Sequence, residues 1–184
     1  MSRIGKATSH EYFHHSSQVW MRLVEISALL RQDHAMEHAT INLLIKQLDK
    51  RAHLLGHTAI GGFYIYGDVP TEMVDKAARE ALRRLREGSY ELAISPMCGT
   101  NLAVAGLAAG VASLIAGRDC TGWNKFGRVV QASVLAVVIA QPLGRMAQRY
   151  LTTDADQYNA SKVMVTRQKM GSITRHRVKV LRSY

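Results

Sequence analysis

The 184-residue chain is long enough for one domain, or for one domain that carries a membrane element. Its formal net charge of +10 indicates an anionic partner, either nucleic acid or a membrane surface. The basic residues cluster near the ends of apolar segments and in the C-terminal tail, which favours membrane lipid. No RNA-binding aromatic pattern and no zinc-finger spacing supports nucleic acid, and two cysteines are too few for a disulfide framework.

The first segment of the chain, residues 1–17, is polar and rich in histidine. It lacks the apolar core of a secretory signal peptide, so we expect a flexible leader. From Gln18 to about Arg51, apolar residues recur at intervals of three and four, which predicts a long helix. This helix is expected to break once near Gln32-Asp33, with Asp33 capping a second helix.

That helix contains the sequence His34-Ala35-Met36-Glu37-His38. Positions i, i+3 and i+4 share one helix face, so His34, Glu37 and His38 converge, and they do so on the apolar stripe. A divalent metal would make such a buried polar trio tolerable, and the spacing matches the His-x-x-Glu-His motif in which the Glu acts as a base. The alternatives are a hydrogen-bonded core cluster and an exposed face.

The middle of the chain predicts a strand–helix–strand unit. Gly56 to Gly62 is rich in glycine and ends the helical region, with His53 and His57 at the helix end. A first strand is expected at Phe63–Tyr66, and an amphipathic helix capped by Asp68 or Thr71 is expected to follow and to end at Gly88. Residues 90–95 predict the second strand.

Two apolar runs without charge, residues 102–116 and 129–143, predict a helical hairpin that spans a bilayer or, alternatively, is buried in protein. Gly106 and Gly110 have the spacing that lets membrane helices touch, either with partner helices or in self-association. The outer flanks carry more basic residues than the connection, so both chain ends are expected in the cytoplasm. Cys98 and Cys120 would then lie on opposite sides and form no intramolecular disulfide.

The C-terminal segment supplies two further carboxylates, Asp154 and Asp156. Either one offers a third metal ligand. Alternatively, Thr153 or Asp154 caps a helix that runs through Met164. Gly171 ends this helix, and residues 173–181 predict a last strand.

Four motifs in this chain resemble, in their order, those of two related bacterial membrane families: His34-Ala-Met-Glu37-His38-Ala-Thr-Ile, Cys98-Gly-Thr-Asn101, Gln141-Pro142 and Leu151-Thr152-Thr153. One family is a cyanobacterial-type domain of unknown function with a His-Ala-Met-Glu-His helix, and this similarity covers most of the chain from about Asp33 onward. The other is a set of predicted metal-dependent membrane enzymes with His-Gly-Ala-Glu-His-Lys, Cys-Gly-Thr-Ser and Leu-Thr-Thr motifs.

The resemblance implies roles for the motif residues His34, Glu37, His38 and Cys98, and less directly for Thr152 and Thr153. The chain departs from the enzyme set at Ala39, where that set has Lys, and at Asn101, where it has Ser. Ser95-Pro96-Met97 stands where the enzymes have His-Pro-Arg, so one histidine that offers a ligand there is absent here.

We therefore expect an α+β fold in four parts. These are a leader (1–17), the motif helix with the strand–helix–strand unit (18–100), an inserted membrane hairpin (101–144), and a helix and strand that complete the cytoplasmic domain (145–184).

The expected function is a metal-dependent hydrolase of the inner membrane, with a peptidase among the candidates. In this interpretation His34 and His38 bind zinc or another divalent metal, and Glu37 acts as the base. Cys98, Asp154 or Asp156 would be the third ligand. The alternative is a non-catalytic scaffold whose polar trio is structural and whose glycine-rich helix packs on partner helices.

Overall fold

The computed structural model describes residues 9–48, 53–118, 121–171 and 173–183, and it has an α+β architecture. A long helix, α1 (Ser9–Gln47), is followed by strands β1 (Leu55–Ala59) and β2 (Gly62–Tyr66) and by helix α2 (Thr71–Arg86). A 3₁₀ turn, η1 (Tyr90–Ala93), leads to the hairpin helices α3 (Gly99–Ala116) and α4 (Gly122–Ala147). A π-helical turn, η2 (Gln148–Thr152), and strands β3 (Ala160–Met170) and β4 (Ile173–Arg182) complete the chain.

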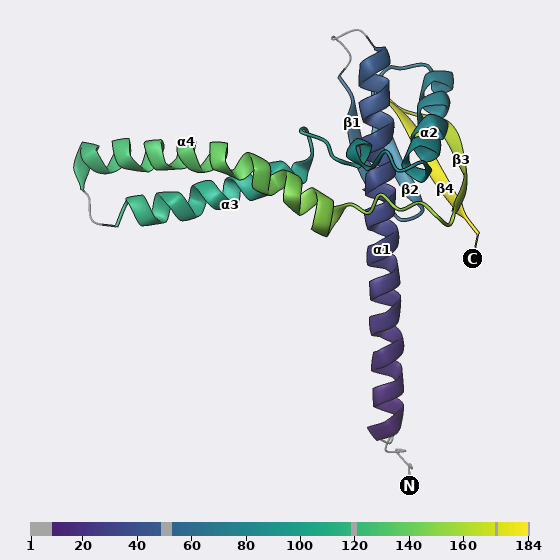
Figure 1. Cartoon of the computed structure of the whole chain (residues 1–184), viewed down its shortest axis with the longest axis horizontal. Coiled ribbons are helices and arrows are strands. Elements are labelled where there is room, and N and C mark those ends of the chain that lie inside the picture. Colours follow the sequence, from purple (N-terminus) through teal and green to yellow (C-terminus); the bar gives the residue numbers. More distant parts are fainter. Residues whose placement is uncertain (1–8, 49–52, 119–120, 172, 184) are drawn as a thin grey trace.

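The four strands form one antiparallel sheet in the order β1-β2-β4-β3. The C-terminal half of α1 packs against β1 and β2, and α2 packs beside it against β3 (Figure 1). Between helices and sheet lies an apolar core, because each element turns its apolar side inward. Its fully buried members include Met36, Leu44, Phe63, Ile65, Val74 and Val178.

Helix α1 is continuous through Gln32-Asp33, so the predicted break is wrong. The Asp33 carboxylate is fully buried rather than capping a helix. It forms an ion pair of 2.7 Å with Arg182 of β4 and accepts a hydrogen bond of 2.8 Å from the Gly62 amide. These partners hold α1 against the sheet. The helix also includes residues 9–17, where the sequence predicts a leader, whereas residues 1–8 lie outside the described part of the chain.

Three further local predictions change. Residues 90–93 form a 3₁₀ turn rather than the second strand of the unit, and β1 instead pairs with β2 as its hairpin partner. The predicted helix through Met164 is strand β3, which pairs with β4 along residues 160–170. Alternation in β4 gives it one buried side, and this long partner overrides the local helix preference in β3. The N-cap of α2 is Pro70, not Asp68 or Thr71. Helix α2 itself and strands β2 and β4 form where the sequence predicts them.

Helices α3 and α4 form the predicted hairpin, which extends away from the rest of the molecule, crosswise to α1 (Figure 1). Both helices are long and apolar enough to cross a membrane. Their contact includes a 2.7 Å hydrogen bond between the hydroxyls of Ser113 and Ser133. Pro142 does not end α4, which continues to Ala147. Cys120 lies outside the described residues, and Cys98 is a free thiol.

Candidate metal centre

Three side chains from two parts of the sequence meet at one point. His34 and His38 lie on consecutive turns of α1, and Cys98 is the N-cap of α3. One ligand atom from each residue lies within 4.8 Å of the other two. The Cys98 Sγ to His34 Nε2 distance is 3.6 Å, close to the separation of about 3.5 Å that two ligands of one tetrahedral zinc ion have.

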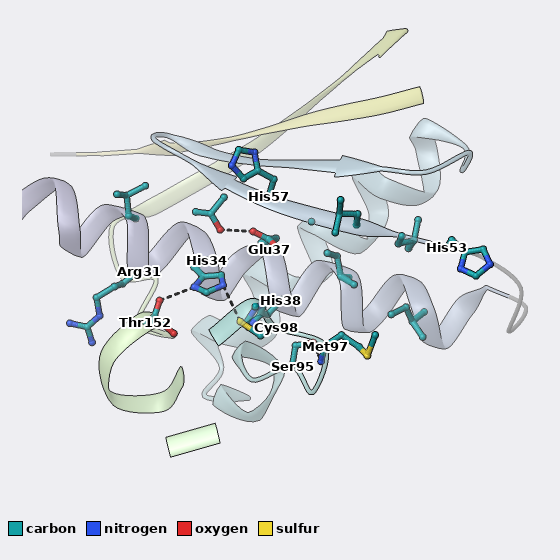
Figure 2. A pocket seen from close by; sticks show the side chains of 18 residues that line it. Arg31, His34, Glu37, His38, His53, His57, Ser95, Met97, Cys98 and Thr152 are labelled. Atoms are coloured by element: carbon teal, nitrogen blue, oxygen red, sulfur yellow. Dashed lines mark hydrogen bonds between the residues drawn. The ribbon is translucent and has the colours of Figure 1, made fainter. Parts of the chain in front are cut away.

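Both imidazoles are held by backbone carbonyls on their other nitrogen. His34 Nδ1 donates to the Thr152 carbonyl at 2.9 Å, and His38 Nδ1 donates to the Ala93 carbonyl at 2.7 Å. Since a carbonyl only accepts, Nδ1 carries a proton in each ring, so Nε2 is the nitrogen that either donates to the Cys98 thiolate or, without its proton, binds a metal. This arrangement orients and fixes the tautomer of metal-binding histidines in general. Figure 2 shows His34 between Thr152 and Cys98.

The position of Cys98 is fixed by the base of the hairpin. The buried side chain of Gln148 in η2 accepts from the Ser95 amide at 2.9 Å and donates to the Ser95 carbonyl at 3.0 Å. It also donates to Asn101 Oδ1 at 2.7 Å, and Asn101 in turn donates to the carbonyls of Ser95 and Pro96. These bonds tie the turn that precedes Cys98 to both hairpin helices.

The electrostatics of the cluster favour ionised sulfur. Burial opposes ionisation of the Cys98 thiol, but hydrogen bonds from His34, His38 and Thr100 outweigh it and lower the pKa of Cys98 to about 5. Burial also acts to lower the pKa of His34, yet its contacts with Cys98 and the Thr152 carbonyl raise that pKa overall. Thiolate and imidazole are ligands that a zinc ion prefers, so the chemistry of the three donors fits this metal.

Glu37 lies between the two histidines along α1 and is almost fully buried. Its carboxylate accepts a short hydrogen bond from the Thr58 hydroxyl of β1. Burial raises the pKa of Glu37, although Thr58 and the two histidines act in the opposite direction. Gly56 allows this close approach, because a Cβ there would lie 2.1 Å from Glu37 Oε1.

The cluster borders a pocket of about 770 Å³. Its polar lining includes His34, Glu37, His38 and Cys98, and most of the remaining wall is apolar (Figure 2). Three protein donors do not fill a tetrahedral sphere, and a pocket at the same point leaves space for a further ligand. The group can therefore bind a metal that also contacts a small molecule.

The other predicted ligands lie elsewhere. Among the described residues, the convergent group holds neither Asp154 nor Asp156. The Asp154 carboxylate accepts from the Asp156 amide at 3.1 Å, which is a turn contact, and Asp156 is exposed. His53 and His57 line the pocket without joining the group, and the His57 ring stacks on Tyr64 at 6.4 Å. His34, His38 and Cys98 thus come together, whereas Glu37 lines the same pocket outside this group and the carboxylates after the hairpin do not join it.

A family model for a domain of unknown function (DUF6391) matches residues 29–164. The chain belongs to this family. An uncharacterised protein of Picosynechococcus sp. (strain ATCC 27264 / PCC 7002 / PR-6) is 36% identical over 137 residues, which is 67% of this chain and 65% of that protein. The chain therefore spans less than two thirds of that relative's length. No solved structure matches.

The region that matches the DUF6391 model begins before His34 and contains the hairpin and η2, so it includes every residue of the cluster. Neither the family description nor the relative's name states an activity. The predicted relation to metal-dependent membrane enzymes stays a prediction.

Sequence reasoning missed four residues that build the site: Gly56, Thr58, Asn101 and Gln148. Gly56 was visible only as a turn signal, because its role depends on which strand approaches Glu37. Asn101 stood in a recognisable motif, but its partner Gln148 lies 47 residues away and no local pattern connects the two.

Proposed function

We propose that this protein is a metal-dependent hydrolase anchored in a membrane by the α3–α4 hairpin, with zinc bound by His34, His38 and Cys98. The observation that carries the proposal is the convergence of three donor atoms within 4.8 Å beside a pocket of about 770 Å³. A structural zinc site usually has four protein ligands, whereas a catalytic one has three and an open position. Three donors beside a pocket match the catalytic arrangement.

A zinc ion at this point would polarise a carbonyl group and activate water for attack. The residues of the chain supply the remaining functions. Glu37, one turn from His34 on the same helix face, accepts the proton of the attacking water and passes it to the leaving group. Thr58 orients the Glu37 carboxylate, and the wall of the pocket beside it is mostly apolar. The bond broken is an amide or ester bond.

The hairpin supplies the membrane anchor in this proposal. Large apolar side chains are exposed along both helices, and lipid would cover them. The exposed residues include Leu102, Leu107, Leu114, Val134, Leu135 and Val138. The distribution of Lys and Arg favours cytoplasmic placement of both chain ends and of the metal centre, with the connection after α3 on the far side.

The test is the metal content and the hydrolytic activity of purified full-length protein in detergent. We expect about one zinc per chain, and its loss in His34→Ala, because only two donors remain. His57→Ala is the matched control, since His57 lines the same pocket outside the group and its loss leaves the zinc in place. Glu37→Gln should keep the zinc and lose hydrolysis of fluorescent casein and of p-nitrophenyl esters.

Two outcomes would contradict the proposal. Protein that contains no zinc, or that loses it equally in His57→Ala and His34→Ala, would exclude the metal centre. If Glu37→Gln retains zinc and hydrolyses the substrates at an unchanged rate, Glu37 is not the base of the reaction.

A second function, assembly with partner membrane helices, is favoured by one observation. Gly106 and Gly110 lie on the outer side of α3, and a Cβ added at either would meet nothing within 4 Å. Their spacing therefore does not serve packing against α4 and is free for another helix. Gly106→Leu with Gly110→Leu should abolish chemical cross-linking between copies or with partner helices, whereas Val111→Leu, which adds bulk away from the two glycines, should not. Cross-linking that is equal in both variants would contradict this assignment.

A further inference from the structure

The N-terminal half of α1 leaves the body of the protein and carries exposed apolar side chains (Figure 1). Trp20 is 68% exposed and Val24 is 66% exposed. Isolated exposed apolar residues are ordinary, but a contiguous group on one helix marks a surface that binds another apolar phase. The group consists of Val19, Trp20, Met21, Leu23, Val24 and Ile26.

Most of these residues share one side of the helix. From Val19, the steps to Leu23, Ile26 and Leu30 are four, three and four residues, and Trp20 and Val24 flank this line. Arg22 lies at the edge of this line opposite Trp20, and Glu25 and Met21 lie on the other side of the helix. The segment is therefore amphipathic, although most of α1 beyond it is buried in the core.

The same side of the helix carries the metal centre. His34 follows Leu30 by four residues, so the apolar line continues into the cluster, and Leu30 lines the pocket. His34 contacts Cys98, the residue from which α3 departs. The apolar side of the projecting half of α1 thus faces the side on which the hairpin leaves the molecule.

The directions of the hairpin and of α1 together indicate how the molecule would lie on a membrane. The hairpin extends crosswise to α1 (Figure 1), and its first helix begins directly after Cys98 of the metal centre. A hairpin that crosses a bilayer points along the membrane normal, so α1 then runs along the membrane surface. Because its apolar side is on the hairpin side, that side meets the lipid.

We propose that residues 18–30 of α1 form an interfacial helix that lies on the bilayer into which the hairpin inserts. This inference rests on the membrane-spanning hairpin of the proposed function, but not on zinc or hydrolysis. Trp20 sits at the level of the lipid headgroups, where an indole is favoured, and Arg22 stays in water or reaches a phosphate. The occupant of the exposed face is lipid rather than a second copy of the chain, because the orientation follows from the hairpin of the same molecule.

The wall of the pocket adds to this exposed apolar surface. Three residues of its wall are exposed and apolar: Ile45, Leu55 and Met97, the last with 84% of its surface exposed. Together with Leu30 they continue the apolar face of the interfacial helix. An interfacial helix would therefore bring the exposed part of the pocket wall to the bilayer surface.

The experiment uses the fluorescence of the full chain in vesicles of phosphatidylcholine and phosphatidylglycerol. The chain has two tryptophans, so Trp123→Phe leaves Trp20 as the only reporter. We expect blue-shifted Trp20 emission and strong loss of intensity with lipids brominated near the carbonyl end of the acyl chain, with weaker loss when bromine is near the chain end. Leu23→Asp should shift the emission toward that of water-exposed tryptophan, and Ala28→Asp, which places the same charge about 140° around the helix, should not.

Emission at the water-exposed position, without quenching by brominated lipid, would overturn the inference. Blue-shifted emission that ignores bromine and grows with the protein-to-lipid ratio would assign the face to a second copy and would also overturn it. Trp20→Phe distinguishes a failure of the interfacial helix from a failure of the membrane anchor, because Trp123 is then the reporter and lies in the hairpin. If brominated lipid quenches Trp123 in this variant but does not quench Trp20 in Trp123→Phe, the hairpin anchor stands and only the interfacial helix is excluded. The zinc content of the same preparations reports separately on the metal centre.

Discussion

The two halves of α1 have the same apolar periodicity and opposite surroundings. In the C-terminal half, the sheet and α2 bury Met36, Ala39 and Leu44 completely. In the N-terminal half, which projects from the body of the protein (Figure 1), Leu23 is 51% exposed. A pattern of threes and fours thus identifies the apolar side of a helix, but it does not identify what covers that side.

The largest expected loss of stability tests what holds the C-terminal half of α1, the half covered by the sheet and α2. Arg182→Met should destabilise the fold by about 4 kcal/mol, because it leaves the fully buried Asp33 carboxylate without its ion-pair partner. The exposed pair of Arg79 and Asp75 is the control, and Arg79→Met should cost about 0.5 kcal/mol or less. Denaturant unfolding followed by circular dichroism in detergent measures both. Equal losses would show that Asp33 is not held by Arg182.

The difference between the two halves of α1 can be tested directly with one substitution in each half. Leu44→Ala should cost about 3 kcal/mol, because it opens a cavity in the core. Leu23→Ala should change the free energy of unfolding in detergent by about 0.5 kcal/mol or less. The two variants are measured under the same conditions. A loss of several kcal/mol for Leu23→Ala would show that the N-terminal half packs against protein.

A smaller effect is expected where the covered half meets β1. Gly56→Ala should cost about 2 kcal/mol, because its Cβ would overlap the Glu37 carboxylate and force α1 and β1 apart. Gly99→Ala is the control, since a Cβ there meets nothing within 4 Å. Thermal unfolding compares the two variants. The prediction fails if Gly99→Ala is the more destabilised protein.

The last prediction concerns metal affinity rather than the free energy of unfolding, and it is made at the hairpin base. Gln148→Leu removes the hydrogen bonds that fix the turn before Cys98, which should weaken zinc binding about 10–100-fold. Gln168→Leu on the exposed part of β3 should leave the zinc affinity unchanged. Competition with a zinc-binding dye measures both affinities. Unchanged affinity in Gln148→Leu would show that the turn holds Cys98 without this network.

The sequence predicted the motif helix, the hairpin, β2, α2 and β4, because in each a single local period or composition decides the structure. It also brought His34, Glu37, His38 and Cys98 into one hypothesis. It did not predict β3, since the strand state of residues 160–170 depends on pairing with β4. The Asp33–Arg182 pair joins residues 149 positions apart, and such contacts have no local signal.

The central claim is that two nitrogens and one sulfur of this chain bind a single zinc ion with one position left open. X-ray absorption of the zinc-loaded full-length protein tests it most directly. The account predicts one sulfur neighbour at about 2.3 Å, two imidazole nitrogens at about 2.0 Å and one further light atom, with the sulfur absent in Cys98→Ser. A zinc environment without sulfur in the unmodified chain, or one that Cys98→Ser leaves unchanged, would contradict it.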